Sequence, residues 1–400
     1  MLGFFAVLGL TNGDWLARIP ALAHGLHLSD GMLGLVLLAA PAGSAAAAPI
    51  VGALVDRAGS RVPTLLGAVA VPFLPILFSL ASDQVVLMIA MFVFGLASSL
   101  LDVSMNAQAV HLQQAVGRQL MTSFHACYSF GALAGGLVGG AFAWGNAGTT
   151  ADFTAVAVPL AAFAWVSGRF LLTPSEEAPA SGGAAPRAER LVERVRPAAP
   201  GARAARRVSR LSPLLVLSLL ALCSLLGEGA ADGWSAIYLR DNLATSAGFA
   251  AMGYAAFALT MASGRLVGDR LADRFGPVAL LRAGGLLAAA GLVTVLVTGV
   301  PAGAVAGFAI YGAGLSCTFP QMLALAGAIR PDRPGSAIGR VAGTGYAGLL
   351  AGPVLIGGIA TVAGLTAALG LPATLALGIA VGAGYGVPRH ALAGSDQAGG

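Results

Sequence analysis

Charged residues are scarce in this sequence, and their scarcity excludes whole classes of protein. Only 10% of the 400 residues are Asp, Glu, Lys or Arg, whereas soluble domains carry about 25%. All of the 22 basic residues are arginine. Hydrophobic residues make up 57% of the chain and the mean hydropathy is +0.83. Too few charges exist to cover a water-soluble globule of this length, so we expect a chain that lies in a lipid bilayer.

Cysteine and histidine are also rare, which argues against disulfides, metal centres and most active sites. The three cysteines, Cys127, Cys223 and Cys317, stand singly in apolar runs, and the five histidines are scattered. With no cysteine pair and no HExxH-type spacing, we expect no metal, no cofactor and no enzyme activity. The formal net charge of +5 comes from arginines without interleaved aromatic residues, so we expect no nucleic-acid partner.

Long apolar runs fill most of the chain. A helix needs about 20 apolar residues to cross the hydrocarbon core of a membrane. When the sequence is divided at its polar, glycine and proline residues, it predicts twelve membrane spans. They are roughly 1–24, 32–55, 62–81, 85–108, 121–145, 153–172, 212–239, 248–268, 277–299, 303–328, 337–360 and 366–388. The expected fold class is an all-α membrane protein, with twelve transmembrane helices in two pseudo-symmetric six-helix bundles.

The predicted spans divide the chain into four parts. We expect a six-helix bundle at 1–172, a solvated linker rich in Pro, Ala and Arg at 173–211, a second six-helix bundle at 212–390, and a tail at 391–400. The loop arginines fall almost entirely on one side if the spans alternate, which puts both termini and the linker in the cytoplasm. We therefore expect a multi-pass protein of a bacterial inner membrane. The first apolar run lacks a basic leader, so we expect a mature span and a native start some residues upstream.

One pattern is written twice in the chain. Asp56-Arg57-Ala58-Gly59 recurs as Asp273-Arg274-Phe275-Gly276 (273 − 56 = 217). At the same shift Gly131, Gly135 and Gly140 recur as Gly348, Gly352 and Gly357, and Gly95 and Ser99 recur as Gly312 and Ser316. A shift held at separate places indicates one duplicated unit. Two such apolar halves are how many secondary transporters build a central site that opens to either side.

The repeated charged loops carry the first resemblance. The residues of the first loop are Gly52, Asp56, Arg57 and Gly59, and those of the second are Asp269, Arg270, Asp273, Arg274 and Gly276. This pair of loops resembles the signature loop of the major facilitator superfamily. The resemblance implies that superfamily's fold and a gate latch that stabilises one conformer. The alternative is that these charges are ordinary loop ion pairs.

Several polar residues lie inside predicted spans, where they are costly and usually face a cavity. Asp14 and Arg18 are four residues apart and can pair on one helix face. Asp102 and Asn106 also share a face, and a carboxylate in low dielectric can exchange a proton near neutral pH. His125 titrates in the physiological range. Each group also has a structural reading, as an ion pair or an interhelical hydrogen bond.

The candidate site residues follow from these positions. We expect proton coupling by Asp102, Asp14 and His125. We expect solute binding by Asn106, Gln108, Tyr128, Trp15, Glu228, Asp232, Trp234 and Tyr238. The aromatic rings beside Glu228 and Asp232 suit a sugar face or a cation, and they suit an interfacial belt equally well.

Three short runs carry a closer resemblance. Asn12-Gly13-Asp14, Asp102-Val-Ser-Met-Asn106 and Tyr128-Ser-Phe-Gly131 resemble the fucose-permease branch of sugar/proton symporters. The stretch from Asp102 to Gly131 is similar to the MosC-like group. The resemblance implies that Asp14 contacts substrate or proton and that Asp102 is the protonatable carrier, although the permease branch has Glu where this chain has Asp102.

The function implied by this resemblance is alternating-access transport. We expect a monomer that moves a small polar solute, sugar-like or polyol-like, across the lipid bilayer with protons as the coupling partner. Efflux of an amphiphilic drug by proton antiport is one alternative, and it predicts a more apolar, aromatic-lined cavity. A transporter-like sensor that binds without transport is another, and an exchange assay discriminates it.

Overall fold

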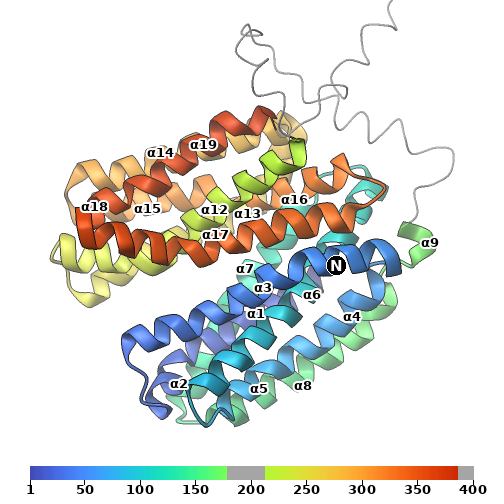
Figure 1. Cartoon of the computed structure of the whole chain (residues 1–400), viewed down its shortest axis with the longest axis horizontal. Helices are drawn as coiled ribbons and strands as arrows, with labels where there is room; N and C mark the ends of the chain where they lie inside the picture. Colours follow the sequence, from blue (N-terminus) through green and yellow to red (C-terminus); the bar gives the residue numbers. More distant parts are fainter. Residues whose placement is uncertain (178–211, 386–400) are drawn as a thin grey trace, which may run out of the picture. The chain divides into compact units, whose positions relative to one another are not determined.

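The computed structural model describes residues 1–177 and 212–385, and within those ranges it consists of helices and short connections (Figure 1). The helices before the gap are α1 (Leu2–Ala17), α2 (Ile19–Gly25), α3 (Asp30–Ala58), α4 (Arg61–Ala70), α5 (Leu74–Ser79), α6 (Gln84–Val116), α7 (Met121–Trp144), α8 (Thr149–Ser167) and α9 (Pro174–Glu177), with 3-10 turns η1 (Val71–Phe73) and η2 (Gly168–Phe170). The helices after it are α12 (Pro213–Ile237), α13 (Ala247–Phe275), α14 (Pro277–Thr298), α15 (Pro301–Leu315), α16 (Thr318–Ile329), α17 (Pro334–Ala363), α18 (Leu365–Ala368) and α19 (Gly370–Gly382), with η3 (Tyr238–Asn242) and η4 (Ala383–Tyr385). Most of the predicted linker and all of the predicted tail lie outside the described residues.

Several helices begin at a capping serine or end at a glycine that can be recognised in the sequence. Ser29, Ser212 and Ser246 each accept a hydrogen bond from the backbone N–H three residues later, which caps α3, α12 and α13. The two repeated loops end α3 and α13 in the same way. Gly59 and Gly276 have φ of 78° and 83°, a region that side chains rarely adopt, so both copies of the loop need glycine there.

Within the described residues, ten stretches of helix are long and apolar enough to cross a membrane by length and composition. The other two predicted spans are present as helices with different properties. The span predicted at 1–24 is broken at Arg18 into α1 and α2. The span predicted at 248–268 is the 29-residue helix α13, whose C-terminal part carries Arg265 and the charges of the second loop.

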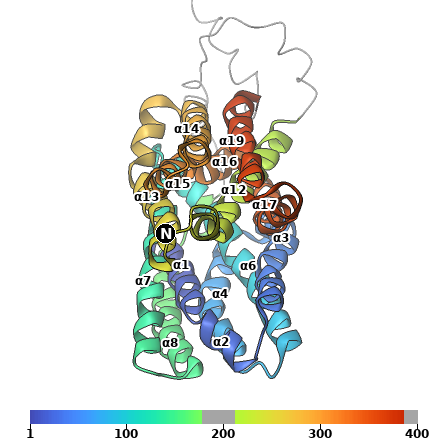
Figure 2. The same ribbon diagram turned by 90° about the vertical axis from the view of Figure 1, so that its left-hand side faces the viewer.

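The described residues cluster into two compact units. The first comprises residues 1–112, 123–177 and 333–343, and the second comprises 113–122, 212–332 and 344–385. In the first unit, α8 packs against α1 and α4, as Figure 2 shows. In the second unit, α14 packs against α15 and α19 (Figure 1). The first turns of α17 therefore belong to the first unit, and the segment that joins α6 to α7 belongs to the second.

The repeated glycines make the same close helix contacts in both units. A Cβ added at Gly95 would lie 2.0 Å from the carbonyl oxygen of Ala40, and one at Gly312 would lie 2.2 Å from that of Phe257. Ala40 and Phe257 are themselves separated by the repeat shift of 217 residues. Gly135 on α7 likewise meets the backbone of α1, and Gly352 on α17 meets the backbone of α12. These helix pairs touch backbone to backbone, which only small residues permit.

Candidate functional site

A buried polar chain links α6 to α7 in the first unit. The Asn106 amide nitrogen donates to the Asp102 carboxylate at 3.1 Å and to the Asp102 carbonyl oxygen at 2.8 Å. The Asn106 amide oxygen lies 3.3 Å from Nε2 of His125. The side chains of all three residues are buried, and the His125 ring lies edge-on to Phe5 with centroids 5.2 Å apart. The structure thus joins two predicted proton-coupling residues through a neutral amide.

A second polar contact joins α1 to α7. The Asn12 amide nitrogen donates to the Tyr128 hydroxyl at 3.1 Å, and the Trp15 indole N–H donates to the Asn12 amide oxygen at 3.2 Å. Trp15 is only 6% exposed, because its ring packs edge-on against Phe78 and Phe94. Trp15 therefore holds Asn12 in place, and its own face is already covered by aromatic rings.

Arg18 pairs with a residue that the sequence did not suggest. Its Nε lies 3.3 Å from Oδ2 of Asp152 in the first turn of α8, and its Nη2 donates to the Ala147 carbonyl oxygen. The predicted ion pair with Asp14 is not made: α1 ends at Ala17, and Arg18 leaves the helix with φ −97° and ψ 0°. The four-residue spacing therefore no longer places the guanidinium over the Asp14 carboxylate.

The side-chain amide of Gln108 is hydrogen-bonded to other groups of the protein through both its nitrogen and its oxygen. Its amide nitrogen donates to the Leu172 carbonyl oxygen at 3.0 Å and to the Glu177 carboxylate at 2.8 Å, while its amide oxygen accepts from the Leu172 backbone N–H at 3.1 Å. Glu177 also accepts from the backbone N–H and the hydroxyl of Ser60. These contacts tie α9 to α6 and to the start of α4, and they leave Gln108 no free group for a solute.

The second unit has its own cluster of charges at the middle of α12. Glu228 is half-buried and Asp232 is exposed, although both lie within a membrane-length helix. Helix α12 packs against α13, which carries Arg265, and against α15, which carries the buried Tyr311. Arg265 is 6% exposed, and its Nε donates to the Ser316 carbonyl oxygen at 3.2 Å. The predicted acidic pair thus has a buried cationic neighbour.

The two aromatic residues predicted beside these acids have different surroundings. The Tyr238 hydroxyl donates to the Val295 carbonyl oxygen at 3.4 Å, and its side chain is 3% exposed. Trp234 is half-buried, and its indole N–H has no hydrogen-bond acceptor among the described residues. Trp234 therefore keeps a free donor, whereas the Tyr238 hydroxyl ties η3 to α14.

The first charged loop caps a helix that begins 278 residues later in the chain (334 − 56 = 278). The Asp56 carboxylate accepts from the backbone N–H of Gly335 at 2.8 Å and from that of Ser336 at 2.9 Å. The Ser336 hydroxyl also donates to it. These N–H groups are the unsatisfied donors of the first turn of α17, where the helix dipole also favours an anion. Arg57, the neighbour of Asp56, is exposed.

The second charged loop makes the corresponding contacts in the second unit. Asp273 accepts from the backbone N–H of Gln119 at 3.1 Å, and Asp269 accepts from the backbone N–H and the hydroxyl of Thr122. Thr122 lies in the first turn of α7, and Gln119 lies two residues before that helix begins. The arginines of this loop, Arg270 and Arg274, are exposed, and Arg274 lies over the Phe275 ring. In both loops the aspartates, rather than the arginines, carry the helix-capping contacts.

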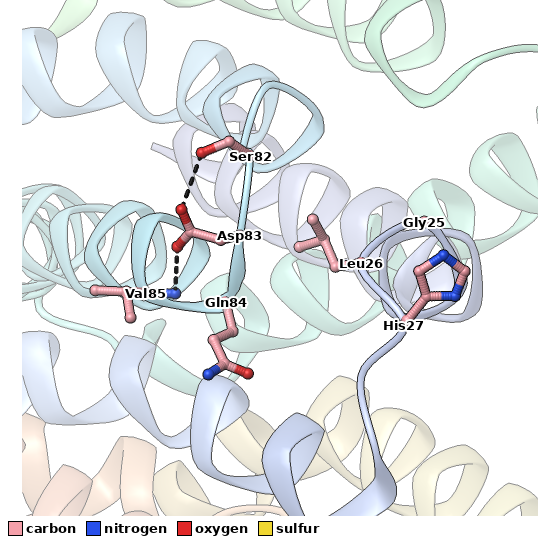
Figure 3. Close-up of a pocket in the computed structure, with 7 residues that line it drawn as sticks. All are labelled: Gly25, Leu26, His27, Ser82, Asp83, Gln84 and Val85. Carbon is pink, nitrogen blue, oxygen red and sulfur yellow. Dashed lines mark hydrogen bonds between the residues drawn. The ribbon is translucent and has the colours of Figure 1, made fainter.

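A surface hollow of about 360 Å³ lies between the α2–α3 connection and the start of α6 (Figure 3). It is lined by Gly25, Leu26, His27, Ser82, Asp83, Gln84 and Val85. The Asp83 carboxylate is used to cap α6: it accepts from the N–H groups of Val85 and Val86 and from the Ser82 hydroxyl. The Val86 N–H, then the Ser82 hydroxyl, hold the pKa of Asp83 below its usual value. None of the predicted site residues lines this hollow.

Sequence reasoning missed three charged residues that the structure brings to these clusters. Asp152 lies one residue before the predicted start of the span at 153–172, so a search for charges inside the predicted spans does not include it. Arg265 lies well inside the span predicted at 248–268, where an arginine is itself a signal. Glu177 lies in the predicted linker, where acidic residues carry no information. A search of the sequence for charged residues inside and next to the predicted spans could therefore have found Asp152 and Arg265.

The chain is similar in sequence to known membrane proteins. A family model described as Major Facilitator Superfamily matches residues 2–240 and 217–399. An uncharacterised MFS-type transporter of Yersinia pestis is 32% identical over 357 residues, which cover 89% of this chain and 87% of the relative. Membrane protein MosC of Rhizobium meliloti is 29% identical over 356 residues, with coverage of 89% and 82%.

The fold is also found among solved structures. FucP, a fucose:proton symporter of E. coli, superimposes in its outward conformation with a TM-score of 0.74 at 16% identity, and 96% of each chain is covered. At this level of identity the likeness concerns the fold alone. It confirms the predicted fold class, an all-α membrane protein of twelve helices in two related halves.

Proposed function

The chain belongs to the Major Facilitator Superfamily and is a multi-pass membrane transporter, and from that premise we propose that it moves a small polar solute coupled to protons. The solute we propose is sugar-like or polyol-like. Transport occurs by alternating access, in which a central site opens first to one side of the membrane and then to the other.

The observation that carries the proton coupling is the chain formed by Asp102, Asn106 and His125. The Asn106 amide donates to Asp102, so its oxygen is the acceptor for His125, whose Nε2 then carries the hydrogen. An imidazole and a carboxyl group can each take up or release a proton, and the carboxylate lies in a buried site where its charge is costly. A proton gained or lost at one end therefore changes the hydrogen bonding at the other.

Polar groups in the two units support a polar solute. Asn12 and Tyr128 meet between α1 and α7, and α12 carries Glu228, Asp232 and Trp234, whose indole N–H has no acceptor among the described residues. Hydroxyl, amide, indole and carboxylate groups are those that recognise the hydroxyls of a sugar or polyol. FucP, which shares the fold, is a fucose:proton symporter. Gln108, Trp15 and Tyr238 are assigned to packing and positioning in this proposal.

The two aspartate loops supply the proposed gate. Each holds the start of a helix by accepting its free backbone N–H groups, Asp56 at α17 and Asp269 with Asp273 at α7. Such contacts form or break as a set when a helix end moves, which suits a latch that favours one conformer. By the positive-inside rule, the loops lie on the cytoplasmic face of the membrane. We propose that this membrane is the inner membrane of a bacterium. We also propose that the protein is a monomer.

The test begins with the solute. Purified protein is screened by thermal shift against sugars, polyols and amphiphilic drugs, and the best ligand is used in proteoliposomes. Asp102→Asn is expected to abolish accumulation driven by a proton gradient while counterflow exchange at fixed pH persists, because exchange needs no net proton movement. Asp83→Asn, which alters an exposed helix cap, is the control that keeps both activities.

Three other outcomes would each overturn part of the proposal. Concentrative uptake by Asp102→Asn removes this residue as the proton carrier. A melting shift with amphiphilic drugs alone replaces the sugar proposal with efflux. Binding without any counterflow in the wild-type protein replaces transport with sensing.

A further inference from the structure

The indole ring of Trp234 on α12 lies against a glycine of α17. A Cβ added at Gly357 would lie 3.0 Å from Cζ2 of the ring and 3.5 Å from Cη2. The first of these distances is closer than most Cβ contacts in proteins, so a side chain at position 357 would displace the ring. The absence of a side chain at Gly357 therefore lets the six-membered part of the indole approach α17 closely.

The corresponding helix pair of the first unit packs without such a ring. Position 234 corresponds to Ala17 (234 − 17 = 217), and position 357 corresponds to Gly140 (357 − 140 = 217). A Cβ added at Gly140 would meet nothing within 4 Å. Helices α1 and α7 nevertheless contact each other backbone to backbone through the repeated glycines, as α12 and α17 do. The helix pair therefore does not need an aromatic ring at this place, and Trp234 has another role in the second unit.

The indole N–H of Trp234 indicates that role. Its nitrogen is covered by protein, and it has no hydrogen-bond acceptor among the described residues. A buried N–H without an acceptor costs free energy, so the ring is held by packing and not by a hydrogen bond. An oxygen atom of a solute that accepted from this N–H would remove the cost.

The other predicted solute-binding groups of this segment offer no free donor. Ionised Glu228 and Asp232 side chains only accept hydrogen bonds, and the Tyr238 hydroxyl already donates to the Val295 carbonyl oxygen. A compound with several hydroxyl groups can give hydrogens to the carboxylates and accept one from the indole. The donor on Trp234 thus complements the acids of α12 for a neutral sugar or polyol.

We propose that Gly357 is a positioning residue of the solute site: it places the Trp234 indole so that its N–H donates a hydrogen bond to a solute oxygen. Because the N–H is covered, a solute reaches it only when the ring leaves Gly357 or α17 bends. Pro353, one turn before Gly357, has no N–H for the Leu349 carbonyl oxygen, so α17 lacks one backbone hydrogen bond there and bends more easily. The donor role rests on the proposed function, whereas the placement of the ring is measured without solute.

The first measurement is the fluorescence of Trp234 in the full-length protein in lipid nanodiscs. Its emission is isolated by subtracting the spectrum of the same protein that also carries Trp234→Phe. Gly357→Ala is expected to move this emission to longer wavelength, because the added methyl group displaces the half-buried ring from α17. Gly358→Ala is the matched control, since a Cβ there meets nothing within 4 Å. An unchanged emission in Gly357→Ala overturns the positioning role.

The second measurement is the calorimetric affinity for fucose and for sorbitol, one neutral sugar and one neutral polyol. Trp234→Phe and Gly357→Ala are each expected to weaken binding roughly 2- to 10-fold, the value of one neutral hydrogen bond, while Gly358→Ala keeps the wild-type affinity. In the double variant the two losses should not add, because Gly357 acts through Trp234. Additive losses, or wild-type affinity in Trp234→Phe, overturn the donor role.

The same preparations separate this inference from the proposed transport. A wild-type protein that binds a probe without counterflow removes only the proposed transport. A wild-type protein that binds neither probe overturns the donor role together with the sugar proposal, and the fluorescence of Gly357→Ala then still decides whether Gly357 places the ring.

Discussion

The Asp56 carboxylate accepts hydrogen bonds from both the backbone N–H and the hydroxyl of Ser336, which lies 280 residues further along the chain. The same relationship joins Asp273 to the backbone N–H of Gln119. Each residue of one pair is separated from its counterpart in the other by the repeat shift of 217 residues. The duplicated loop has therefore kept its capping geometry in both copies, and only its carboxylate is needed for that geometry.

Removing this carboxylate is expected to loosen the start of α17. Asp56→Ala leaves the N–H groups of Gly335 and Ser336 without their acceptor, and losing a hydrogen bond to a charged group costs roughly 1.5–3 kcal/mol. Amide exchange there should rise roughly tenfold or more, as read by hydrogen–deuterium exchange and mass spectrometry of peptides that cover residues 334–340. Arg57→Ala is the matched control, because the Arg57 side chain is exposed. If Arg57→Ala raised amide exchange as much as Asp56→Ala does, the latch would depend on the charges of the loop in general and not on the Asp56 carboxylate.

The glycine contacts predict paired effects in the two units. Gly95→Ala places a methyl group 2.0 Å from the Ala40 carbonyl oxygen, and Gly312→Ala places one 2.2 Å from that of Phe257. Each is expected to destabilise the protein by roughly 1–3 kcal/mol, because α6 and α3, or α15 and α13, must separate. Gly34→Ala on α3, where a Cβ meets nothing within 4 Å, is the control. Thermal unfolding in detergent measures all three, and tolerance of Gly95→Ala would show that the helix pair shifts freely.

Adjacent glutamates on α9 should behave differently. Glu177 accepts from Ser60 and Gln108, so Glu177→Ala is expected to cost about 2 kcal/mol and to lower the melting temperature. Glu176 bonds only within its own turn, where the backbone N–H and then the hydroxyl of Thr173 hold its pKa below the usual value. Glu176→Ala should leave the melting temperature nearly unchanged. Similar losses from both variants would contradict the role given to Glu177.

Much of the fold could be predicted because it depends on properties that repeat along the chain. The shift of 217 residues marks loops and glycines, and those glycines make equivalent backbone contacts in the two units. The face shared by Asp102 and Asn106 follows from helical spacing alone, and the structure confirms the contact between them. The contact between His125 and Asn106 does not follow from helical spacing, because the two residues lie on consecutive helices.

The candidate site was harder to predict where it depends on helix ends and on partners distant in sequence. Spacing predicted that Asp14 pairs with Arg18, yet the helix ends between them and the guanidinium reaches Asp152 on α8. The span was predicted to begin at 153, whereas α8 begins at Thr149, so Asp152 was left out of the search for charges inside spans. Gln108 was predicted to bind solute from its position on α6. Its commitment to Leu172 and Glu177 depends on a turn after α8, which helical periodicity does not describe.

The bridging amide of Asn106 gives the most direct test of the proposed relay. Asn106→Leu has nearly the same volume but removes the bonds to Asp102 and His125, so it leaves buried polar partners without this group and should cost roughly 1–3 kcal/mol of stability. It should also abolish accumulation driven by a proton gradient while solute counterflow continues, because the two titratable ends are no longer connected. Ser99→Ala is the matched control on the same helix, since the buried Ser99 hydroxyl has no hydrogen-bond partner among the described residues. If Asn106→Leu still concentrates solute as the wild type does, protons reach the transport cycle by another route than this amide.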